Sequence, residues 1–114
     1  MTFPYLDLAA IQIAHYVSDF WLQPRSWAEN KHKSLNCLTL HSLTYAVPFV
    51  CYGYGYYIYN VLAHWVVDFI TSRLIHKYMR QNNRLGVIRV FGLDQTLHFI
   101  NLTVSYFLIY KGGF

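Results

Sequence analysis

The sequence alternates between long apolar segments and shorter polar connections. The four apolar segments cover residues 4–23, 35–53, 56–76 and 91–110. Each is close in length to the ~20 residues that a helix needs to cross a bilayer. Each also carries a few polar positions, so none is apolar throughout. The pattern predicts an all-α fold, a four-helix transmembrane bundle that forms a single integral membrane domain over residues 1–114.

The composition favours the same interpretation. Of the 114 residues, 55% are hydrophobic, 19% are aromatic and only 12% are charged. An ordinary soluble domain carries about 25% charged residues. We therefore expect a multi-pass protein of the inner (cytoplasmic) membrane, with membrane lipid as its surroundings.

The basic residues predict how the chain crosses the membrane. Eight of the nine Lys and Arg residues lie in or beside the first and third connections, and only Lys111 follows the last segment. By the positive-inside rule, these two connections face the cytoplasm. Four crossings then place both termini on the outer side. The net charge of +4 is thus explained by topology, and we predict no nucleic-acid partner.

Three pairs of histidine and aspartate interrupt the apolar segments. In each pair the residues are four positions apart, and the pairs are His15 and Asp19, His64 and Asp68, and Asp94 and His98. This spacing places both members on one face of a helix, about 6 Å apart along its axis. The pairs use three of the five acidic residues in the chain. One further histidine, His41, lies near the start of the second segment.

The predicted topology brings these seven residues to one depth, towards the cytoplasmic side of the membrane. We therefore expect a polar His/Asp core inside the bundle, surrounded by a lipid-facing exterior. Charged groups inside a bilayer are costly and usually mark functional sites. A bound cation would compensate for that cost.

Imidazole and carboxylate ligands together suit Zn²⁺, with Mn²⁺ or Fe²⁺ as alternatives. The predicted metal ligands are His15, Asp19, His41, His64, Asp68, Asp94 and His98. They are more than one zinc ion needs. Either two ions bind, or one ion binds and the aspartates orient the ligand histidines. A bound metal would lower the pKa of a water molecule towards about 7 and so generate a nucleophile.

Other interpretations of the seven residues stay open. They could form a proton or ion pathway, or a purely structural network that ties the helices together. Ligation of haem by two histidines is also known in helical bundles. The carboxylates beside the histidines make haem the less attractive cofactor.

The segments "HYVSDFWLQP", "WAENKHKS", "HWVVDFITSR" and "FGLDQTLHF" resemble a family of small bacterial and phage integral membrane proteins of unknown function. The shared motifs are H-x3-D-F-x-L-Q, H-x3-D and D-Q-x2-H, and they extend over nearly the whole chain. The resemblance adds Gln23, Trp27, Lys31 and Gln95 to the residues of interest. The family is also distantly similar to membrane-bound metal-dependent hydrolases, which implies hydrolytic chemistry.

Together these observations predict a membrane-embedded, metal-dependent hydrolase. Its substrate would be a lipid or lipid-linked ester or phosphoester near the cytoplasmic face. The predicted catalytic residues are Asp19, Asp68 and Asp94, and the predicted ligand-orienting or substrate-binding residues are Gln23, Lys31, Asn60, Gln95 and Asn101. The alternative is a non-enzymatic metal or proton carrier, or a small phage-type membrane factor that acts on a host membrane protein. Because 114 residues leave little room for a substrate cavity, a homodimer is also expected.

Overall fold

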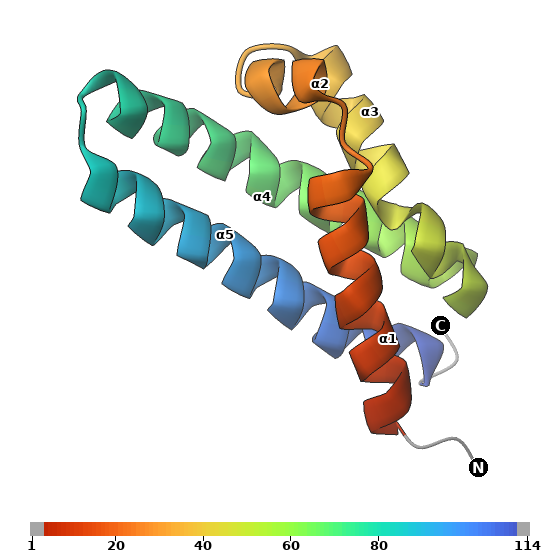
Figure 1. The fold of residues 1–114 in the computed structure, drawn as a ribbon. Coiled ribbons are helices and arrows are strands. Elements are labelled where there is room, and N and C mark those ends of the chain that lie inside the picture. Colours follow the sequence, from red (N-terminus) through yellow and green to blue (C-terminus); the bar gives the residue numbers. More distant parts are fainter. Residues whose placement is uncertain (1–3, 112–114) are drawn as a thin grey trace.

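The computed structural model describes residues 4–111, and this part of the chain is helical, without strands (Figure 1). The fold is therefore all-α, as predicted. The elements are α1 (Pro4–Tyr16), the π-helical turn η1 (Val17–Trp21), α2 (Arg25–Asn30), α3 (Leu35–Ala46), the 3₁₀ helix η2 (Val47–Tyr52), α4 (Tyr54–Arg80), α5 (Arg84–Ser105) and the π-helical turn η3 (Tyr106–Tyr110).

Helices α4 and α5 form a long antiparallel hairpin that gives the molecule its elongated shape of 51 × 27 × 22 Å (Figure 1). Helix α1 crosses this hairpin, and α3 packs against the first half of α4. The short helix α2 packs on α3 and lies in the predicted first connection, residues 24–34. Four long helical segments thus surround one interior.

The hairpin is longer than predicted. Residues 76–89 were expected to be a polar connection, but α4 continues to Arg80 and α5 starts at Arg84. Lys, Arg, Gln and Leu are good helix formers, so polarity alone does not end a helix here. The turn depends on two asparagines. Asn82 has a positive φ of 54°, and the side chain of Asn83 accepts a hydrogen bond from the Gly86 N–H at 2.9 Å.

The second predicted segment, residues 35–53, changes its helix type near the middle. Its α-helix ends at Ala46, and Pro48 lies in the first turn of the 3₁₀ helix that follows. Proline lacks the N–H that an α-helix would use, which explains the change. Gly53, with φ of 100°, then turns the chain into α4. Such a backbone conformation suits glycine because it has no Cβ.

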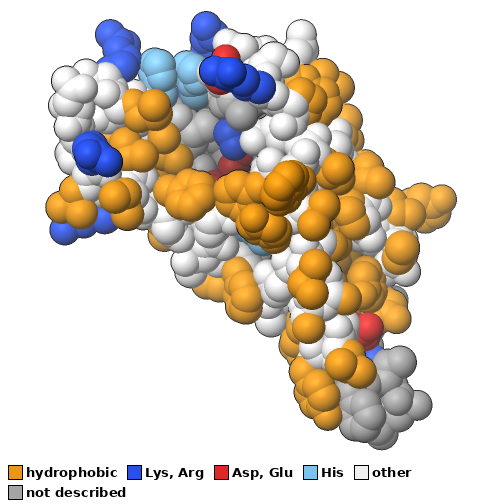
Figure 2. All heavy atoms as spheres, in the orientation of Figure 1, with side chains coloured by type: hydrophobic (Ala, Val, Ile, Leu, Met, Phe, Trp, Pro, Cys, Tyr) orange, Lys and Arg blue, Asp and Glu red, His pale blue; other side chains and the backbone are white. Residues whose placement is uncertain are grey.

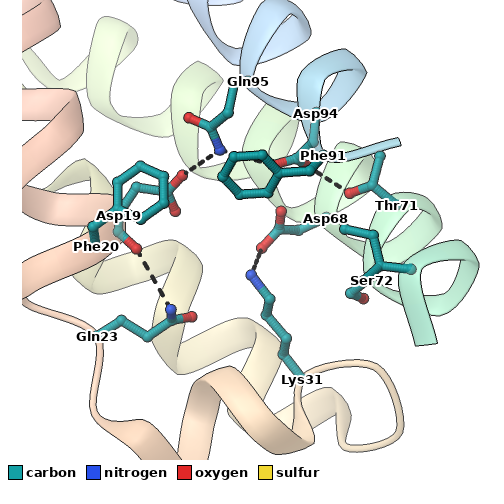
Figure 3. Close-up of a pocket in the computed structure, with 11 residues that line it drawn as sticks. Asp19, Phe20, Gln23, Lys31, Asp68, Thr71, Ser72, Phe91, Asp94 and Gln95 are labelled. Carbon is teal, nitrogen blue, oxygen red and sulfur yellow. Dashed lines mark hydrogen bonds and ion pairs between the residues drawn. The ribbon is translucent and has the colours of Figure 1, made fainter. Parts of the chain in front are cut away.

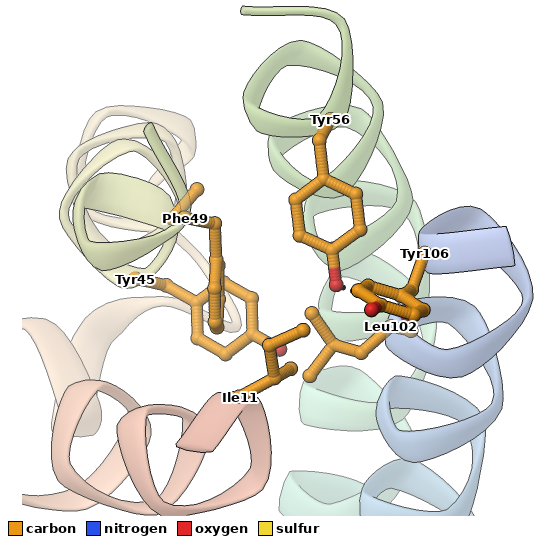
Figure 4. Close-up of a cluster of buried hydrophobic side chains, with 7 residues drawn as sticks. Ile11, Tyr45, Phe49, Tyr56, Leu102 and Tyr106 are labelled. Carbon is orange, nitrogen blue, oxygen red and sulfur yellow. Dashed lines mark hydrogen bonds between the residues drawn. The ribbon is translucent and has the colours of Figure 1, made fainter. Parts of the chain in front are cut away.

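Burial is inverted relative to an ordinary soluble domain. An apolar cluster fills one end of the interior; we call it the aromatic core (Figure 4), and it consists of Ile11, Tyr45, Ala46, Phe49, Tyr56, Leu102 and Tyr106. Elsewhere among the described residues, most buried side chains are polar, and many large apolar side chains are exposed (Figure 2). By length and hydropathy, none of the helices within residues 4–111 qualifies as a membrane-crossing helix.

Candidate metal centre

Six of the seven predicted ligands meet inside the bundle. We call them the His/Asp cluster: Asp19, His41, His64, Asp68, Asp94 and His98. They come from η1, α3, α4 and α5, and all six are buried. The cluster contains three overlapping groups, Asp19–His41–His64, His64–Asp68–His98 and Asp19–Asp94–His98. Within each group, one ligand atom from every residue lies within 4.8 Å of the others, so each group could hold a metal ion.

Asp68 is the centre of the cluster. Its Oδ2 atom lies 3.3 Å from the Nε2 atoms of both His41 and His64. Its Oδ1 atom lies 3.4 Å from Nε2 of His98. One carboxylate therefore contacts three imidazoles, and its two oxygens face different histidines. This is the arrangement of a carboxylate that could bridge two ions.

Asp19 enters the cluster from the π-helical turn. The turn is marked by a hydrogen bond from the Leu22 N–H to the Val17 carbonyl oxygen at 3.0 Å. Asp19 Oδ1 lies 3.1 Å from His41 Nε2. Single π-helical turns often occur at functional sites, because they redirect a side chain within a helix. A prediction based on 3.6 residues per turn cannot anticipate this change.

His15 lies beside the three groups and is not part of them. Its Nδ1 atom lies 2.9 Å from the Tyr45 hydroxyl, and its Nε2 atom lies 3.0 Å from Oε1 of Gln95. Both ring nitrogens therefore have partners that are not metal ligands. The predicted role of His15 as a direct ligand stays a prediction, whereas its contacts place it as a support for Gln95.

Gln95 links two carboxylates of the cluster (Figure 3). Its Nε2 group donates hydrogen bonds to Asp19 Oδ2 at 3.1 Å and to Asp94 Oδ2 at 3.0 Å. Asp94 is further held by the Thr71 hydroxyl, which donates to Oδ1 at 2.5 Å. The same Oδ1 atom lies 3.2 Å from His98 Nε2. The orientation of both carboxylates is thus fixed by neighbours from α4 and α5.

Lys31 supplies the positive charge at the cluster (Figure 3). Its Nζ atom, largely buried, lies 2.9 Å from Asp68 Oδ2. Burial lowers the pKa of Lys31, but the hydrogen bond to Asp68 and the negative charges of Asp68, Asp19 and Asp94 together outweigh it, so the pKa is raised and the ammonium is retained. Three buried carboxylates face this one ammonium. If the histidines are neutral, two negative charges remain, and one divalent cation would neutralise them.

The imidazoles also fit a metal ion. The Nε2 atoms of His41 and His64 lie only 2.8 Å apart, within hydrogen-bond distance, so both rings turn the same nitrogen towards one point of the cluster. The His64 ring is held by stacking on Tyr45, with centroids 3.9 Å apart, while its Nδ1 atom is buried without a hydrogen-bond partner. Neutral imidazole nitrogen and carboxylate oxygen are the donor set of many zinc sites.

A cavity of about 110 Å³ lies against the cluster. Asp19, Asp68 and Asp94 form its polar wall, together with the Lys31 and Gln95 side chains (Figure 3). The cavity lies towards α2, whereas the aromatic core fills the interior on the opposite side of the cluster. Among the described residues, the site is therefore approached from the α2 end.

The remaining predicted site residues differ in position. Gln23 lines the cavity, and its Nε2 group donates to the Asp19 carbonyl oxygen at 3.4 Å. Asn60 instead donates to Ser105 Oγ at 3.2 Å, and Asn101 accepts from the Tyr59 hydroxyl at 3.3 Å. Both asparagines therefore connect α4 to α5, one turn beyond the cluster.

The sequence did not predict that two hydroxyl groups contact the site, those of Tyr45 at His15 and of Thr71 at Asp94. Tyr45 follows His41 by four residues, and Thr71 follows Asp68 by three. At these spacings, each shares a helix face with a predicted ligand. Extending the stripe of His and Asp to neighbouring hydroxyl groups would have found both.

Comparisons with known proteins give one finding. No curated protein and no solved structure is significantly similar to the chain. A family model described as "Protein of unknown function (DUF3307)" matches residues 8–112, which include the whole His/Asp cluster. The match agrees with the predicted resemblance to a family of unknown function. The chain therefore belongs to the DUF3307 family.

Proposed function

We propose that the protein is a metal-dependent hydrolase embedded in the inner membrane. Its substrate is a lipid or lipid-linked ester or phosphoester near the cytoplasmic face. One observation carries the proposal: six buried His and Asp side chains from four helical elements converge beside a cavity. Intramembrane or deeply buried ionisable residues are expensive, and here they are gathered in one place.

The cluster supports one or two divalent ions. His41, His64 and His98 would be the nitrogen ligands, and Asp68 would bridge two ions because its two oxygens face different histidines. Zn²⁺ suits these ligands best, with Mn²⁺ and Fe²⁺ as alternatives. A bound ion would supply a nucleophilic hydroxide by lowering the pKa of its water.

The residues of the chain would position the substrate and move the proton. Asp19, Asp68 and Asp94 line the cavity, so any of their free oxygens could accept the proton of an attacking water. Asp94 is the best oriented of the three, because Thr71 and Gln95 both donate to it. The Lys31 ammonium also lines the cavity, where it would stabilise negative charge that develops on the substrate.

The inverted burial pattern supports the membrane location. Large apolar side chains are exposed along α1, α3, α4 and α5, where lipid would cover them (Figure 2). The basic residues would lie on the cytoplasmic side and both termini outside. A second copy of the chain could cover part of the same apolar surface, so homodimerisation stays a prediction.

The geometry favours a hydrolase over a continuously open proton or ion pathway. Such a pathway needs a polar route on both sides of its binding site in one conformation. Here the cavity lies on one side, and the aromatic core fills the other side with side chains such as Phe49 and Leu102 (Figure 4). A site that is open at one end suits a reaction better than continuous conduction.

Hydrolysis of a lipid panel by the zinc-loaded, detergent-purified protein tests the proposal. The panel contains lipids with carboxylic ester and phosphoester bonds. The wild type is compared with the variant Asp94→Asn. We expect activity in the wild type and a loss of about 10²-fold or more in the variant, because a general base contributes that much. Thr96→Ala, on an exposed face of α5 outside the cluster, is the control. Full activity in Asp94→Asn would remove this residue from the mechanism. A metal-loaded wild type that hydrolyses nothing while moving zinc across proteoliposomes would establish the carrier instead.

A further inference from the structure

A second hollow, of about 570 Å³, adjoins the cavity at the cluster. We call it the basic pocket, and it is lined by Glu29, Asn30, Lys31, His32, Lys33, Ser72, Ile75, His76 and Met79. The cavity and the basic pocket share three wall residues, Lys31, Ser72 and Ile75. A molecule seated in the basic pocket would thus reach the His/Asp cluster at this wall.

Basic side chains outnumber acidic ones in the lining of the basic pocket. Lys31, Lys33, His32 and His76 all face it, and Glu29 is the one acidic residue of its lining. The Glu29 carboxylate already pairs with Arg25, whose Nε atom lies 2.6 Å from Oε1.

Further basic side chains lie beside the pocket. A neighbouring hollow shares His76 and adds Arg73, Lys77 and Arg80. Figure 2 shows Lys, Arg and His side chains gathered around a depression at this end of the molecule. The charge of the pocket therefore suits an anion.

Two histidines of the basic pocket stack on each other. The rings of His32 and His76 have centroids 3.8 Å apart and an interplanar angle of 16°. Burial lowers the pKa of His32, and the nearby positive charges of His76, Lys33 and Arg73 lower it further. Stacked parallel rings do not aim their nitrogens at one metal ion. An anion at their edge would instead favour the protonated form of His32.

Ser72 provides an independent sign of a missing ligand. The residue is 7% exposed, and its Oγ atom is buried without a hydrogen-bond partner. Buried polar groups in proteins nearly always have a partner. Ser72 lies in the wall shared by the cavity and the basic pocket, so its hydroxyl could donate to an oxygen of a bound molecule.

We propose that the basic pocket binds a phosphate group of the substrate. Lys33, His32 and His76 would hold this phosphate, and Ser72 and Lys31 would contact it at the inner wall. The ester to be cleaved would then extend into the cavity beside the His/Asp cluster. The bound phosphate belongs either to a lipid head group, as the proposed function requires, or to a soluble phosphate compound, which would change the substrate class of that function. The reaction rests on the proposed hydrolase function, but the phosphate site does not.

Titration of the detergent-purified protein with two probes tests the pocket. The probes are inorganic phosphate and short-chain phosphatidic acid, with phosphatidylcholine of the same chain length as reference. Calorimetry measures affinity, and ¹⁵N NMR of the imidazoles follows the pKa of His32. We expect saturable binding and a rise in that pKa on binding. Lys33→Gln/His76→Gln should weaken binding about tenfold or more, because charge-assisted hydrogen bonds are lost.

The matched control is Arg84→Gln/Arg89→Gln, which removes at least as much positive charge from the same end of the hairpin but leaves the basic pocket unchanged. Equal loss of binding in both double variants would show a diffuse electrostatic effect and overturn the proposal. The proposal would also be overturned if neither inorganic phosphate nor phosphatidic acid showed saturable binding. Ser72→Ala is a smaller, second substitution. This variant should still fold and should bind phosphate several-fold more weakly than the wild type.

The two probes also distinguish a lipid phosphate from a soluble one. Together with zinc binding, they distinguish the phosphate site from the proposed hydrolase function. Binding of phosphatidic acid alone would support a lipid head group, and binding of inorganic phosphate as well would support a soluble compound. Phosphate binding by a protein that takes up no zinc would support the pocket and contradict the hydrolase. Zinc binding without phosphate binding would overturn the pocket alone.

Discussion

Lys31 Nζ lies 2.9 Å from Asp68 Oδ2, the same oxygen that faces His41 and His64. An ammonium group therefore occupies a place next to the atom that would ligate a metal ion. Two cations close to one carboxylate oxygen repel each other. Lys31 should consequently stabilise the metal-free protein and weaken metal binding.

Lys31→Met should have opposite effects on stability and on metal affinity. Removing one partner of a buried pair costs about 3–5 kcal/mol. We expect the unfolding free energy of the metal-free variant to fall by up to that amount, and zinc affinity to rise about tenfold as the competing charge disappears. Denaturant unfolding and competition with a zinc chelator measure the two effects. Lys33→Met, which replaces an exposed neighbouring lysine, is the control. Weaker zinc binding in Lys31→Met than in the wild type would contradict the role of Lys31 as a competing cation.

Gln95→Leu should weaken metal binding although no ligand is removed. Gln95 donates to Asp19 and Asp94, and loss of such orienting partners typically costs 10- to about 100-fold in metal affinity. Thr96→Ala is the matched control, because the Thr96 hydroxyl donates only to the Gly92 carbonyl oxygen on an exposed face. Competition with a zinc chelator measures the zinc affinity of both variants and of the wild type. Equal affinities for Gln95→Leu and the wild type would show that the carboxylates need no such support.

Gly86→Ala should destabilise the hairpin. A Cβ at Gly86 would lie 2.8 Å from Cγ and Cδ1 of Tyr78, so the ring would have to move. Overpacking of this kind costs about 1–3 kcal/mol. Gly92→Ala is the control, since a Cβ there meets nothing within 4 Å and alanine favours the helix. Thermal unfolding should show a lower midpoint for Gly86→Ala only. A midpoint at or above that of the wild type would contradict this prediction. It would mean that the Tyr78 ring can move aside without loss of stability.

Cysteine labelling tests the proposed crossing pattern. Cys51 is exposed beside the turn at Gly53, which the positive-inside rule places on the outer side. In a Cys37→Ser background, an impermeant maleimide should label Cys51 in intact spheroplasts. With Cys51 also replaced by serine, Gln81→Cys at the opposite turn, where the backbone φ is −87°, should be labelled only after permeabilisation. Labelling of both positions from the same side would exclude the proposed topology.

The sequence predicted the helical class and the convergence of the His/Asp cluster, because a spacing of four residues marks one face of a helix. The spacing could not predict that Asp19 enters the cluster from a π-helical turn while His15 contacts Tyr45 and Gln95. The long hairpin was also missed. The polar residues 76–89 were interpreted as a connection, although their helix propensity is high and only the asparagines at 82 and 83 break the helix.

The basic pocket could not be predicted as a pocket. The sequence shows basic residues in two separate connections, but only the fold places the turn after α2 beside α4 and so brings His32 next to His76. The partnerless hydroxyl of Ser72 is likewise invisible in the sequence, where it continues the stripe of His64 and Asp68. Tertiary contacts between distant segments decide both features.

Metal analysis of the detergent-purified protein tests the central claim most directly. Wild type is compared with Asp68→Asn/His98→Gln and with His76→Gln, which replaces a histidine outside the cluster. The account predicts about one or two equivalents of zinc, manganese or iron in the wild type and in His76→Gln, and less than about a tenth of that in the double variant. A wild type that binds none of the three metals, even after reconstitution, would contradict the metal centre and the hydrolase proposed to depend on it.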